Sequence, residues 1–277
     1  MICFESVKEI LDEIYERIPG ISTDQKNIAI KEKIKLLEYK YNNLMNFEVS
    51  VDFENPATRF AYIFKYVTSH ANIIYSFLIN CEDLRKVFFK PSVQVTSLGS
   101  GPGSDVMGFS KYLSNFSLST LVFYYLYDKE LIWGREWEII RKRIEPMDHN
   151  IHFGSFDVTI PSTWKRSYKY LDSDIFTMIY FYSELHLNRD ASILFFNNLI
   201  NKAKSGAIFI YADNKIQTLD NSIDSLFLVD KFQRVNFFER NMRLPHEEQM
   251  DVLQDYISIF GCPVIAPKVT FRVFRKI

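Results

Sequence analysis

Glycine is scarce in this 277-residue chain, yet three of its nine glycines are packed into one short stretch, at Gly99, Gly101 and Gly103. They follow a β-rich run, Val93–Leu98, and precede Asp105–Leu113, whose apolar residues have helical spacing. Glycines at a strand-to-helix junction let the backbone turn tightly and approach a ligand, while the free amides of the new helix face that ligand. The stretch therefore predicts a cofactor-binding turn, with a plain glycine-rich turn as the alternative.

Strand-like and helix-like segments alternate after this turn. Apolar, β-rich runs lie at Leu121–Tyr127, Ile151–Val158, Ile175–Tyr182 and Ala207–Tyr211, and Val269–Phe274 alternates like an edge strand. Helical spacing separates most of them, at Leu131–Ile144, Ala191–Ala203 and Ser222–Val229, and a further helix is expected at Glu247–Phe260. Such alternation predicts an α/β fold with a parallel sheet that helices cover on both faces.

The first ninety residues differ from the rest because they are largely helical. Apolar residues recur at helical spacing over Phe4–Ile18, and Pro19-Gly20 ends that helix. A second helix runs to about Met45, and Asn55-Pro56 opens a third, with proline suited to a first turn. We therefore predict a helical N-terminal cap or lid over residues 1–90 and a cofactor-binding domain over residues 91–277.

Charge and cysteine content limit the classes of partner and compartment. The formal net charge is -1, so no overall positive field attracts nucleic acid, although local basic clusters such as Arg141–Arg143 leave such a partner open. Cys3, Cys81 and Cys262 are widely separated, which predicts neither a disulfide framework nor a zinc site. No segment approaches the roughly twenty apolar residues of a membrane helix. We expect a cytoplasmic protein without a membrane partner, with the nucleus left open as a location.

The spacing of the glycines separates two cofactor classes. The dinucleotide fingerprint is GxGxxG, but Ser104 stands where its third glycine belongs, and the observed order is GxGxG. In this the chain resembles the class I S-adenosylmethionine-dependent methyltransferases, whose first motif is a hydrophobic strand followed by such a turn. The resemblance covers about Val93 to Ile277. It implies a Rossmann-like, doubly wound and mostly parallel seven-stranded sheet, preceded here by the helical extension.

The resemblance also implies S-adenosylmethionine as the cofactor, with acidic residues at the ends of the next two strands. Asp128 follows the second strand and would accept hydrogen bonds from the ribose hydroxyls, and Asp157 follows the third and would lie near the adenine. Arg59 would pair with the methionyl carboxylate, or its helix would only pack as a lid. The full set of expected cofactor-binding residues is Arg59, Leu98, Gly99, Ser100, Gly101, Gly103, Asp105, Asp128, Lys129, Phe156, Asp157, Val158 and Tyr180.

The methyl acceptor is expected beyond the fourth strand, at Tyr182-Ser183-Glu184-Leu185-His186. Methyl transfer needs positioning and removal of a proton from the acceptor, so Glu184 and His186 are candidate general bases and Tyr182 is a candidate orienting group. The alternative is that Glu184 caps a helix and His186 lies on the surface. Asp213-Asn214 resembles a magnesium-binding pair of catechol-type methyltransferases, but it also suits a turn, and we predict no metal.

The acceptor itself is not identified by these residues. An oxygen or nitrogen acceptor on a small molecule or protein, an RNA-modifying version of the enzyme, and a non-catalytic cofactor sensor or scaffold all stay open. The chain also resembles animal methyltransferase-like proteins, and more faintly fungal ribosomal-RNA uridine methyltransferases. We expect S-adenosylmethionine and an unidentified methyl acceptor as partners, and the sequence leaves the oligomeric state open.

Overall fold

The computed structural model describes residues 3–20, 22–143, 150–165, 168–228, 231–241, 244–245 and 248–277. Three of the predicted helix boundaries, Ile144, Val229 and Glu247, lie outside these ranges. No helix within the described ranges combines the length and the apolar character that crossing a membrane requires.

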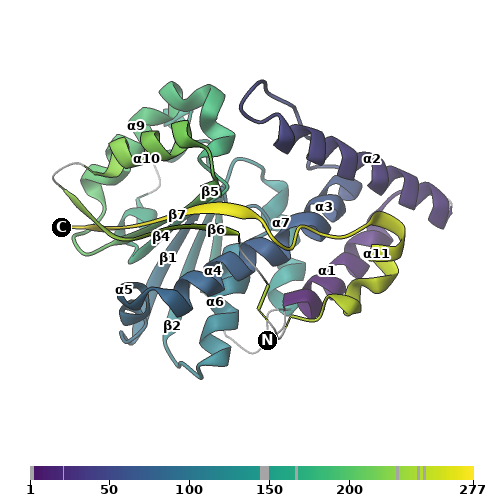
Figure 1. Ribbon diagram of the computed structural model, residues 1–277, viewed down its shortest axis with the longest axis horizontal. Helices are drawn as coiled ribbons and strands as arrows, with labels where there is room; N and C mark the ends of the chain where they lie inside the picture. The colour runs from purple at the N-terminus through teal and green to yellow at the C-terminus, as the bar shows by residue number, and fades with distance from the viewer. Residues whose placement is uncertain are drawn as a thin grey trace.

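A seven-stranded sheet forms the centre of the molecule (Figure 1), with the strand order β3-β2-β1-β4-β5-β7-β6. The strands are β1 (Ser92–Leu98), β2 (Leu121–Asp128), β3 (Asn150–Ser155), β4 (Ile175–Ile179), β5 (Ile208–Asn214), β6 (Phe232–Asn241) and β7 (Lys268–Lys276). The first five pair in parallel, whereas β7 is antiparallel to both β5 and β6. The predicted doubly wound, mostly parallel seven-stranded sheet is thus confirmed.

One strand, β6, was not predicted from the sequence. Its pairing with β7 shifts register between Arg234 and Asn236, so the strand does not keep the two-residue alternation by which a strand is recognised. The other six strands match predicted runs, with ends that differ by a few residues.

Side chains alternate between two hydrophobic layers, one on each face of the sheet. On β5, Ile208 and Ile210 join the core under α6 (Ser104–Asn115), whereas Phe209 and Tyr211 join the opposite core. That opposite core holds α9 (Arg189–Lys202) and α10 (Gln217–Phe227), which lie above the sheet in Figure 1. This three-layer arrangement leaves the carboxyl ends of β1 to β5 together at one edge of the sheet, where ligands bind in open α/β folds.

Helices before the first strand cover the α6 side of the sheet and extend past it. They are α1 (Cys3–Arg17), α2 (Thr23–Asn42), α3 (Pro56–Tyr62), a π-helical turn η1 (Ile63–Val67), α4 (Thr68–Asn80) and α5 (Glu82–Val87). Ser22 and Gln25 form a reciprocal capping box at the start of α2, and the Asn55 side chain accepts from the Ala57 amide at the start of α3. The boundary near residue 90 stays a prediction, since α1, α4 and α6 share one core.

A buried ion pair joins α1 to this core. The Lys111 Nζ on α6 lies 2.5 Å from a Glu248 carboxylate oxygen, and both side chains are fully buried. Lys111 also donates to the Asn72 side chain on α4, and Glu248 accepts from the backbone amides of Cys3 and Phe4. Because removing one partner of a buried pair leaves the other charge uncompensated, this cluster fixes where the N-terminal helix lies.

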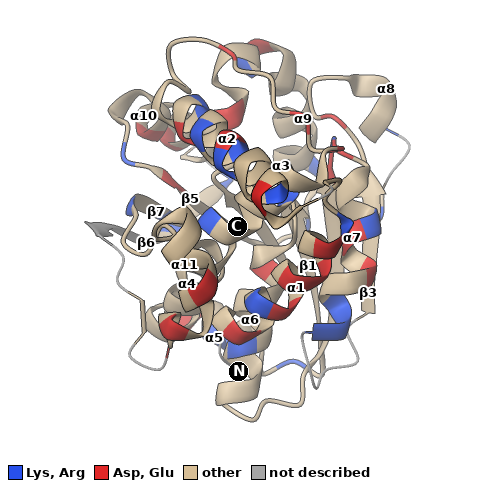
Figure 2. Ribbon diagram, turned by 90° about the vertical axis from the view of Figure 1, so that its right-hand side faces the viewer, with Lys and Arg blue, Asp and Glu red and all other residues tan. Residues whose placement is uncertain are grey.

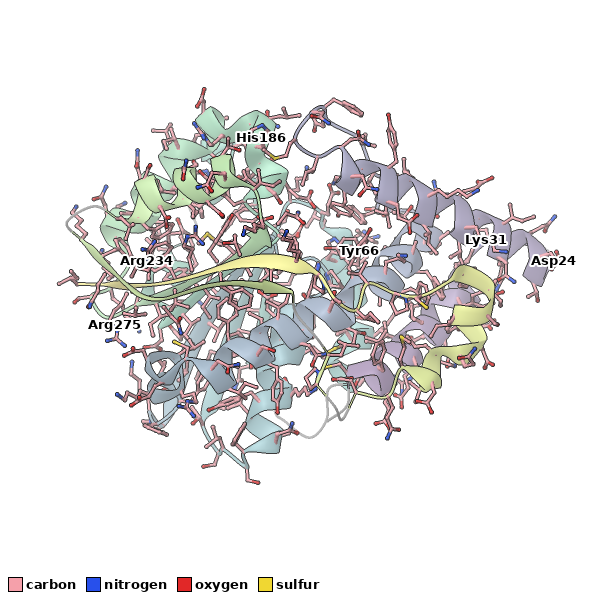
Figure 3. All side chains as sticks on the ribbon, in the orientation of Figure 1. Asp24, Lys31, Tyr66, His186, Arg234 and Arg275 are labelled. Atoms are coloured by element: carbon pink, nitrogen blue, oxygen red, sulfur yellow. The ribbon has the colours of Figure 1, made fainter. Side chains whose placement is uncertain are left out.

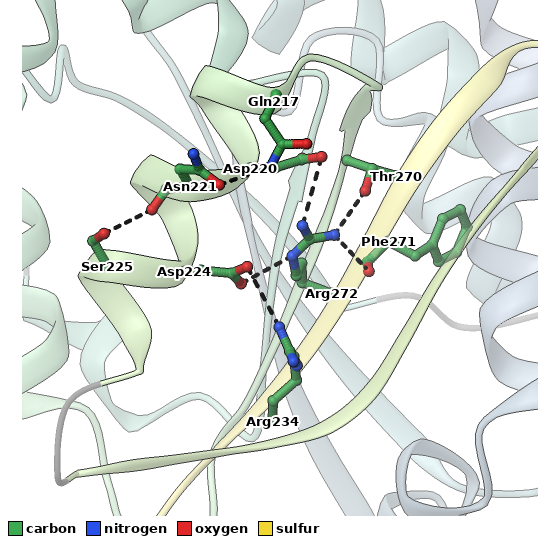
Figure 4. Close-up of polar contacts among 9 residues, drawn as sticks. All are labelled: Gln217, Asp220, Asn221, Asp224, Ser225, Arg234, Thr270, Phe271 and Arg272. Carbon is green, nitrogen blue, oxygen red and sulfur yellow. Dashed lines mark hydrogen bonds and ion pairs between the residues drawn. The ribbon is translucent and has the colours of Figure 1, made fainter.

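The remaining secondary structure is short and connects the larger elements. It comprises α7 (Ile132–Ile140), η2 (Arg141–Arg143), α8 (Pro161–Trp164), η3 (Lys169–Asp172), η4 (Ser183–Asn188), η5 (Met250–Leu253) and α11 (Gln254–Phe260). At the antiparallel edge, Arg272 on β7 pairs with Asp224 at 2.9 Å and Asp220 at 3.5 Å, and donates to Thr270 (Figure 4). This network fastens α10 to β7.

Candidate functional site

The glycine turn between β1 and α6 adopts the left-handed backbone that its composition predicts. Gly99, Gly101 and Gly103 have φ angles of +64°, +49° and +72°. The turn is fixed to the neighbouring strand because the Ser100 amide donates to the Tyr127 carbonyl at 3.0 Å. Non-glycine residues pay for such a conformation with steric strain, so the three glycines are needed for the turn itself.

The space around the three glycines differs, and the difference separates packing from ligand binding. A Cβ at Gly103 would lie 1.4 Å from the Trp137 ring, and a Cβ at Gly99 would lie 2.2 Å from the Phe181 ring. At Gly101, by contrast, none of the described residues has a heavy atom within 4 Å of a Cβ. Gly99 and Gly103 are therefore needed for close packing against aromatic rings, whereas Gly101 borders open space at the turn.

This open space belongs to a pocket at the carboxyl ends of the parallel strands, which we call the strand-end pocket. It is lined by Gly99 and Gly101, by Asp128 and Lys129 after β2, by Phe156, Asp157 and Val158 after β3, by Tyr180 and Glu184 after β4, and by Phe53, Tyr62 and Trp133 from the helical side. Nine of these positions are among the predicted cofactor-binding and catalytic residues. Strand ends far apart in the sequence thus form one site.

Asp128 is hydrogen-bonded to the backbone of the glycine turn. One carboxylate oxygen accepts from the Gly101 amide at 2.8 Å, and the other accepts from the Glu130 amide at 2.9 Å. Burial raises the pKa of Asp128 to about 6, although these two amides favour the charged form. Each carboxylate oxygen can accept a further hydrogen bond, which is what the hydroxyls of a ribose would require.

The residues after β3 provide a flat apolar wall and a second carboxylate. Phe156 is buried and stacks on Tyr127, with ring centroids 4.4 Å apart and planes at 22°. Val158 is buried beside it, and the Asp157 carboxylate accepts from the amide and the hydroxyl of Thr159, at 2.8 and 2.6 Å. A planar base fits such a wall, and Asp157 shapes the loop around it.

Five predicted cofactor ligands are not among the residues that line the strand-end pocket, and the structure gives them other contacts. Leu98 is buried in the core, Gly103 contacts Trp137, and Ser100 serves the turn through its backbone. The Asp105 carboxylate lies beneath the turn, where it accepts from Ser97 at 2.7 Å and from Thr177. It therefore fixes β1 and β4 to the start of α6.

Arg59 is the fifth of these residues. Its Nε lies 2.8 Å from a carboxylate oxygen of the buried Glu136, and Nη1 donates to the carbonyls of Phe53 and Glu54 at 2.6 and 2.7 Å. A guanidinium held by these three partners is not directed at a ligand carboxylate. Arg59 instead positions Phe53, which packs on Trp133 and lines the pocket.

The three candidate catalytic residues separate in space. Glu184 lines the strand-end pocket, and its carboxylate is held by Lys40 Nζ at 2.9 Å and the Tyr41 hydroxyl at 3.1 Å. Tyr182 is buried and bonds to Ser222 on α10, away from the pocket. His186 is half-buried in η4, and Figure 3 shows it near the top of the view, well apart from Tyr66. Only Glu184 keeps a position from which it could act on an acceptor.

A second cavity of about 450 Å³ adjoins the strand-end pocket, and we call it the ring cavity. Its aromatic lining consists of Tyr41, Tyr62, Tyr66, His70 and Tyr180, and its polar lining includes Glu38, Lys65, Ser183, Glu184 and Asn214. Tyr62, Tyr180 and Glu184 line both the ring cavity and the strand-end pocket. A group on a ligand in one space can therefore meet a ligand in the other.

Tyr180 forms the wall between the two spaces in a strained conformation. Its φ angle is +53°, which is rare for a bulky residue, and its amide donates to the Ala212 carbonyl at 2.8 Å. The ring stacks on His70, with centroids 4.5 Å apart. Strain of this kind persists where the surrounding contacts fix it, and it is concentrated at functional sites.

The residues of the ring cavity that come from the N-terminal helices were not predicted from the sequence. Tyr62, Tyr66 and His70 are spaced by four residues, which indicates one face of a helix, and this spacing was the available signal. It was not recognised because aromatic residues at helical spacing are most often core residues. Only the position of α2 shows that these rings line a cavity.

Asp213, at the end of β5, was considered as one half of a magnesium-binding pair. Its carboxylate is fully buried and accepts from the Ser183 amide at 2.9 Å and the Asn214 amide at 2.8 Å. Burial raises the pKa of Asp213 to about 7. Across the described ranges, no three His, Cys, Asp or Glu side chains are grouped as metal ligands would be. The pair thus closes the turn after β5 and supports the start of η4.

Comparison by sequence gives no match to any protein-family model and none to a curated protein. By structure, the chain is similar to a methyltransferase from Pyrococcus furiosus, with 10% identity over 88% of this chain and 97% of that chain, and a TM-score of 0.45. An rRNA methylase from Streptococcus thermophilus is 11% identical over 75% of this chain and 93% of that one, with a TM-score of 0.39.

A further similar structure is the N-methyltransferase NodS from Bradyrhizobium japonicum in complex with S-adenosylhomocysteine, which is 10% identical over 75% of this chain and 98% of that one, with a TM-score of 0.41. These three solved structures are methyltransferases, and they do not single out a subfamily.

Proposed function

We propose that this chain is an S-adenosylmethionine-dependent methyltransferase that transfers a methyl group to an oxygen or nitrogen acceptor. The observation that carries the proposal is the open space at Gly101, beside a carboxylate and a stacked aromatic wall at the ends of three adjacent strands. A side chain at Gly101 would extend into this space, and it would meet no heavy atom of the described residues within 4 Å of its Cβ. Such a cradle fits the nucleoside of the cofactor.

In this proposal, different residues of the strand-end pocket contact the ribose and the base of the nucleoside. Asp128 accepts hydrogen bonds from the ribose hydroxyls, and Phe156 and Val158 contact the base, with the Asp157 loop at its edge. A charged carboxylate suits the first role because it accepts hydrogen bonds without donating any. Lys129 and Glu130 lie at the rim of the pocket and can contact the ligand from outside.

When bound, the cofactor supplies an electrophilic methyl group for an in-line displacement. The residues of this chain have to orient the acceptor and take its proton. Glu184 is placed for the second role because it lines both spaces, and Lys40 and Tyr41 hold its carboxylate in one orientation. Tyr62 and Tyr180 line both spaces as well.

Calorimetric titration of the purified chain with S-adenosylhomocysteine tests this proposal. We expect a dissociation constant in the micromolar range, about -8 kcal/mol, and no binding of NADH under the same conditions. NADH binding without binding of the methyl-donor product would overturn the proposal. The variant Glu184→Gln should bind S-adenosylhomocysteine as the parent protein does, because the substitution keeps the size of the side chain.

A radiolabelled methyl donor then tests transfer against pools of metabolites, protein and RNA. Activity with the parent protein and a loss of roughly 10²-fold or more in Glu184→Gln would support the assigned base. Equal activity in both proteins would assign proton removal elsewhere. Product binding without transfer to any of these pools would favour the sensor or scaffold alternative. The Glu184 carboxylate already accepts hydrogen bonds from Lys40 and Tyr41. This observation favours the sensor or scaffold alternative.

A further inference from the structure

The walls of the ring cavity are mainly aromatic. Tyr66, His70 and Tyr180 form a stack, with Tyr66 and His70 centroids 6.0 Å apart at 27° and His70 and Tyr180 centroids 4.5 Å apart at 22°. The ring centroids of Tyr62 and Tyr66 are 5.4 Å apart, and the ring of Tyr41 contacts that of Tyr66 edge-on, with centroids 5.2 Å apart. The rings that line the cavity thus pack on one another both face to face and edge to face, which are the geometries by which aromatic rings associate.

The π-helical turn η1 is what assembles these rings. In a regular α-helix, residues four apart drift by about 40° for each step, so Tyr62 and His70 would face directions about 80° apart. The five residues Ile63–Val67 form a π-helical segment, whose wider turn reduces this drift, and Tyr62, Tyr66 and His70 all line the same cavity. Single π-helical turns inside helices are common at functional sites, and this one has no proline to explain it.

The charged groups that face the cavity are paired with one another. Glu38 lies 2.8 Å from Lys65 Nζ, and Glu184 lies 2.9 Å from Lys40 Nζ. Burial lowers the pKa of His70 to about 3, so its imidazole is neutral at physiological pH. Lys268 is exposed at the start of β7, where water screens its charge. The carboxylates at the cavity are thus already paired with lysines, so neither a cationic nor an anionic ligand is matched by an unpaired opposite charge there.

The ring cavity adjoins the strand-end pocket at three shared lining residues. Tyr62, Tyr180 and Glu184 line both spaces, whereas Asp157 and Val158 line the strand-end pocket only. If the proposed function is correct, the methyl group emerges at these three shared residues. A group placed in the ring cavity is then placed next to the methyl group.

We propose that the ring cavity binds the methyl acceptor as a neutral aromatic or heteroaromatic ring that carries the reacting oxygen or nitrogen. This inference rests on the proposed function, because it identifies the cavity as the acceptor site of the same enzyme. The acceptor stacks on the tyrosine and histidine rings. Its oxygen or nitrogen would bond to the methyl carbon as the sulfur–methyl bond breaks, S-adenosylhomocysteine would be the leaving group, and Glu184 would take the proton that the acceptor loses. A free small molecule and a base on a single-stranded RNA are the two sources of such a ring.

Saturation-transfer NMR on the full chain, with S-adenosylhomocysteine present at saturation, tests the inference. The probes are 7-hydroxyquinoline, indole and cytidine, and the controls are cyclohexanol, which is neutral but not planar, and choline, which is a cation. We expect saturable binding of at least one ring probe, at least tenfold tighter than either control. Binding of choline but no ring probe would show a cation site and would overturn the inference.

Two variants locate the binding. Tyr66→Leu removes a ring that lines only the ring cavity, and it should weaken the ring probes at least tenfold, whereas Tyr66→Phe keeps the ring and should bind as the parent does. Val264→Trp fills the cavity from its half-buried rim and should abolish probe binding, which provides the test if Tyr66→Leu does not fold. Unchanged probe affinity in Val264→Trp would overturn the inference.

S-adenosylhomocysteine affinity, measured on the same samples, separates this inference from the proposed function. If the product does not bind the parent protein, the proposed function fails; if it binds and no ring probe does, only the inference fails. A cytidine homopolymer distinguishes the sources of the ring. Affinity at least tenfold above that of cytidine would indicate an RNA base, and equal affinity would indicate a small molecule.

Discussion

The strand-end pocket and the ring cavity share a wall but are built in different ways. The strand-end pocket uses backbone: three left-handed glycines, two amides on Asp128, and loops that begin where parallel strands end. The ring cavity uses side chains from α2, η1 and α4, laid over those strand ends. One pocket is thus fixed by the sheet, and the other exists only while the N-terminal helices stay docked.

This difference predicts which substitutions affect which ligand. Changes at the strand ends should alter cofactor affinity and leave the ring cavity in place. Changes in the N-terminal helices should alter the acceptor site and leave cofactor affinity nearly unchanged, because only Phe53, Tyr62 and Glu48 reach the strand-end pocket from that side. The Lys111–Glu248 pair belongs to neither pocket, but it fixes the position of α1 behind the ring-bearing helices.

The largest effect is expected at Gly103, where a side chain has no room. A Cβ there would lie 1.4 Å from the Trp137 ring, so Gly103→Val should destabilise the protein by about 3 kcal/mol or more, measured by urea unfolding. Gly101→Asn is the matched variant, since asparagine tolerates the left-handed backbone and its side chain enters open space. It should change stability by about 1 kcal/mol or less and abolish S-adenosylhomocysteine binding. Equal effects of the two variants on stability would contradict the distinction.

A smaller loss of cofactor affinity is expected at Asp128. Asp128→Asn should weaken S-adenosylhomocysteine binding by about 1.5–3 kcal/mol in calorimetry, because it removes charge-assisted hydrogen bonds. Asp157→Asn is the control, with a smaller loss, because the Asp157 carboxylate is already engaged by Thr159. If the order of the two losses is reversed, the ribose contact lies after β3.

Cofactor affinity should also depend on pH through Asp128. Its pKa is raised to about 6 in the free protein, chiefly by burial, and hydrogen bonds from a ribose would favour the charged form. Affinity should therefore fall as the pH drops below about 6, by up to about tenfold for each pH unit. The profile of Asp128→Asn should be flat over the same range, and a parallel decline in that variant would assign the dependence to another group.

A stability effect of similar or smaller size is expected at Asp213. Burial raises its pKa to about 7 in the folded protein, so the contribution of this group to stability is present at low pH and is lost as the pH rises through about 7. Asp213→Asn cannot acquire the buried charge. Its unfolding free energy relative to the parent should rise by about 2 kcal/mol between pH 5 and pH 8.5. No change in this difference with pH would mean that the Asp213 carboxyl does not take up a proton on folding in this range.

The smallest effect is expected at Lys40, on the helical side of the comparison. Its ion pair with Glu184 is partly exposed, so Lys40→Met should cost about 0.5–1 kcal/mol of stability. S-adenosylhomocysteine affinity should not change, because Lys40 does not line the strand-end pocket. A tenfold loss of affinity in this variant would show that α2 contributes to the cofactor site, and it would remove the distinction between the two pockets.

The contrast also explains which parts of the fold and of the site were predictable. Six of the seven strands and the glycine turn were visible because strand alternation and glycine spacing are local signals. Asp128 and Asp157 were predicted from the family resemblance, and both line the strand-end pocket because parallel strands bring their carboxyl ends to one edge. The strand β6 was missed because its register shift breaks the local pattern.

Side-chain direction was not predictable in the same way. Three side chains that were predicted to belong to the site contact other residues. Arg59 pairs with Glu136, Asp105 accepts from Thr177, and Tyr182 bonds to Ser222. Tyr66 and His70 were not assigned to the site, because their role depends on how α2 packs across the strand ends. Tertiary contacts that cross eighty or more residues, such as Tyr41 with Glu184, leave no trace in local spacing.

The most direct test of the central claim is a crystal structure of the chain with S-adenosylhomocysteine bound. We expect the ribose hydroxyls within hydrogen-bond distance of the Asp128 carboxylate and the base against Phe156 and Val158. The sulfur should face Tyr62, Tyr180 and Glu184. The ring cavity should then open directly onto the sulfur. A product bound outside the strand-end pocket, or a sulfur turned away from these three residues, would contradict the account.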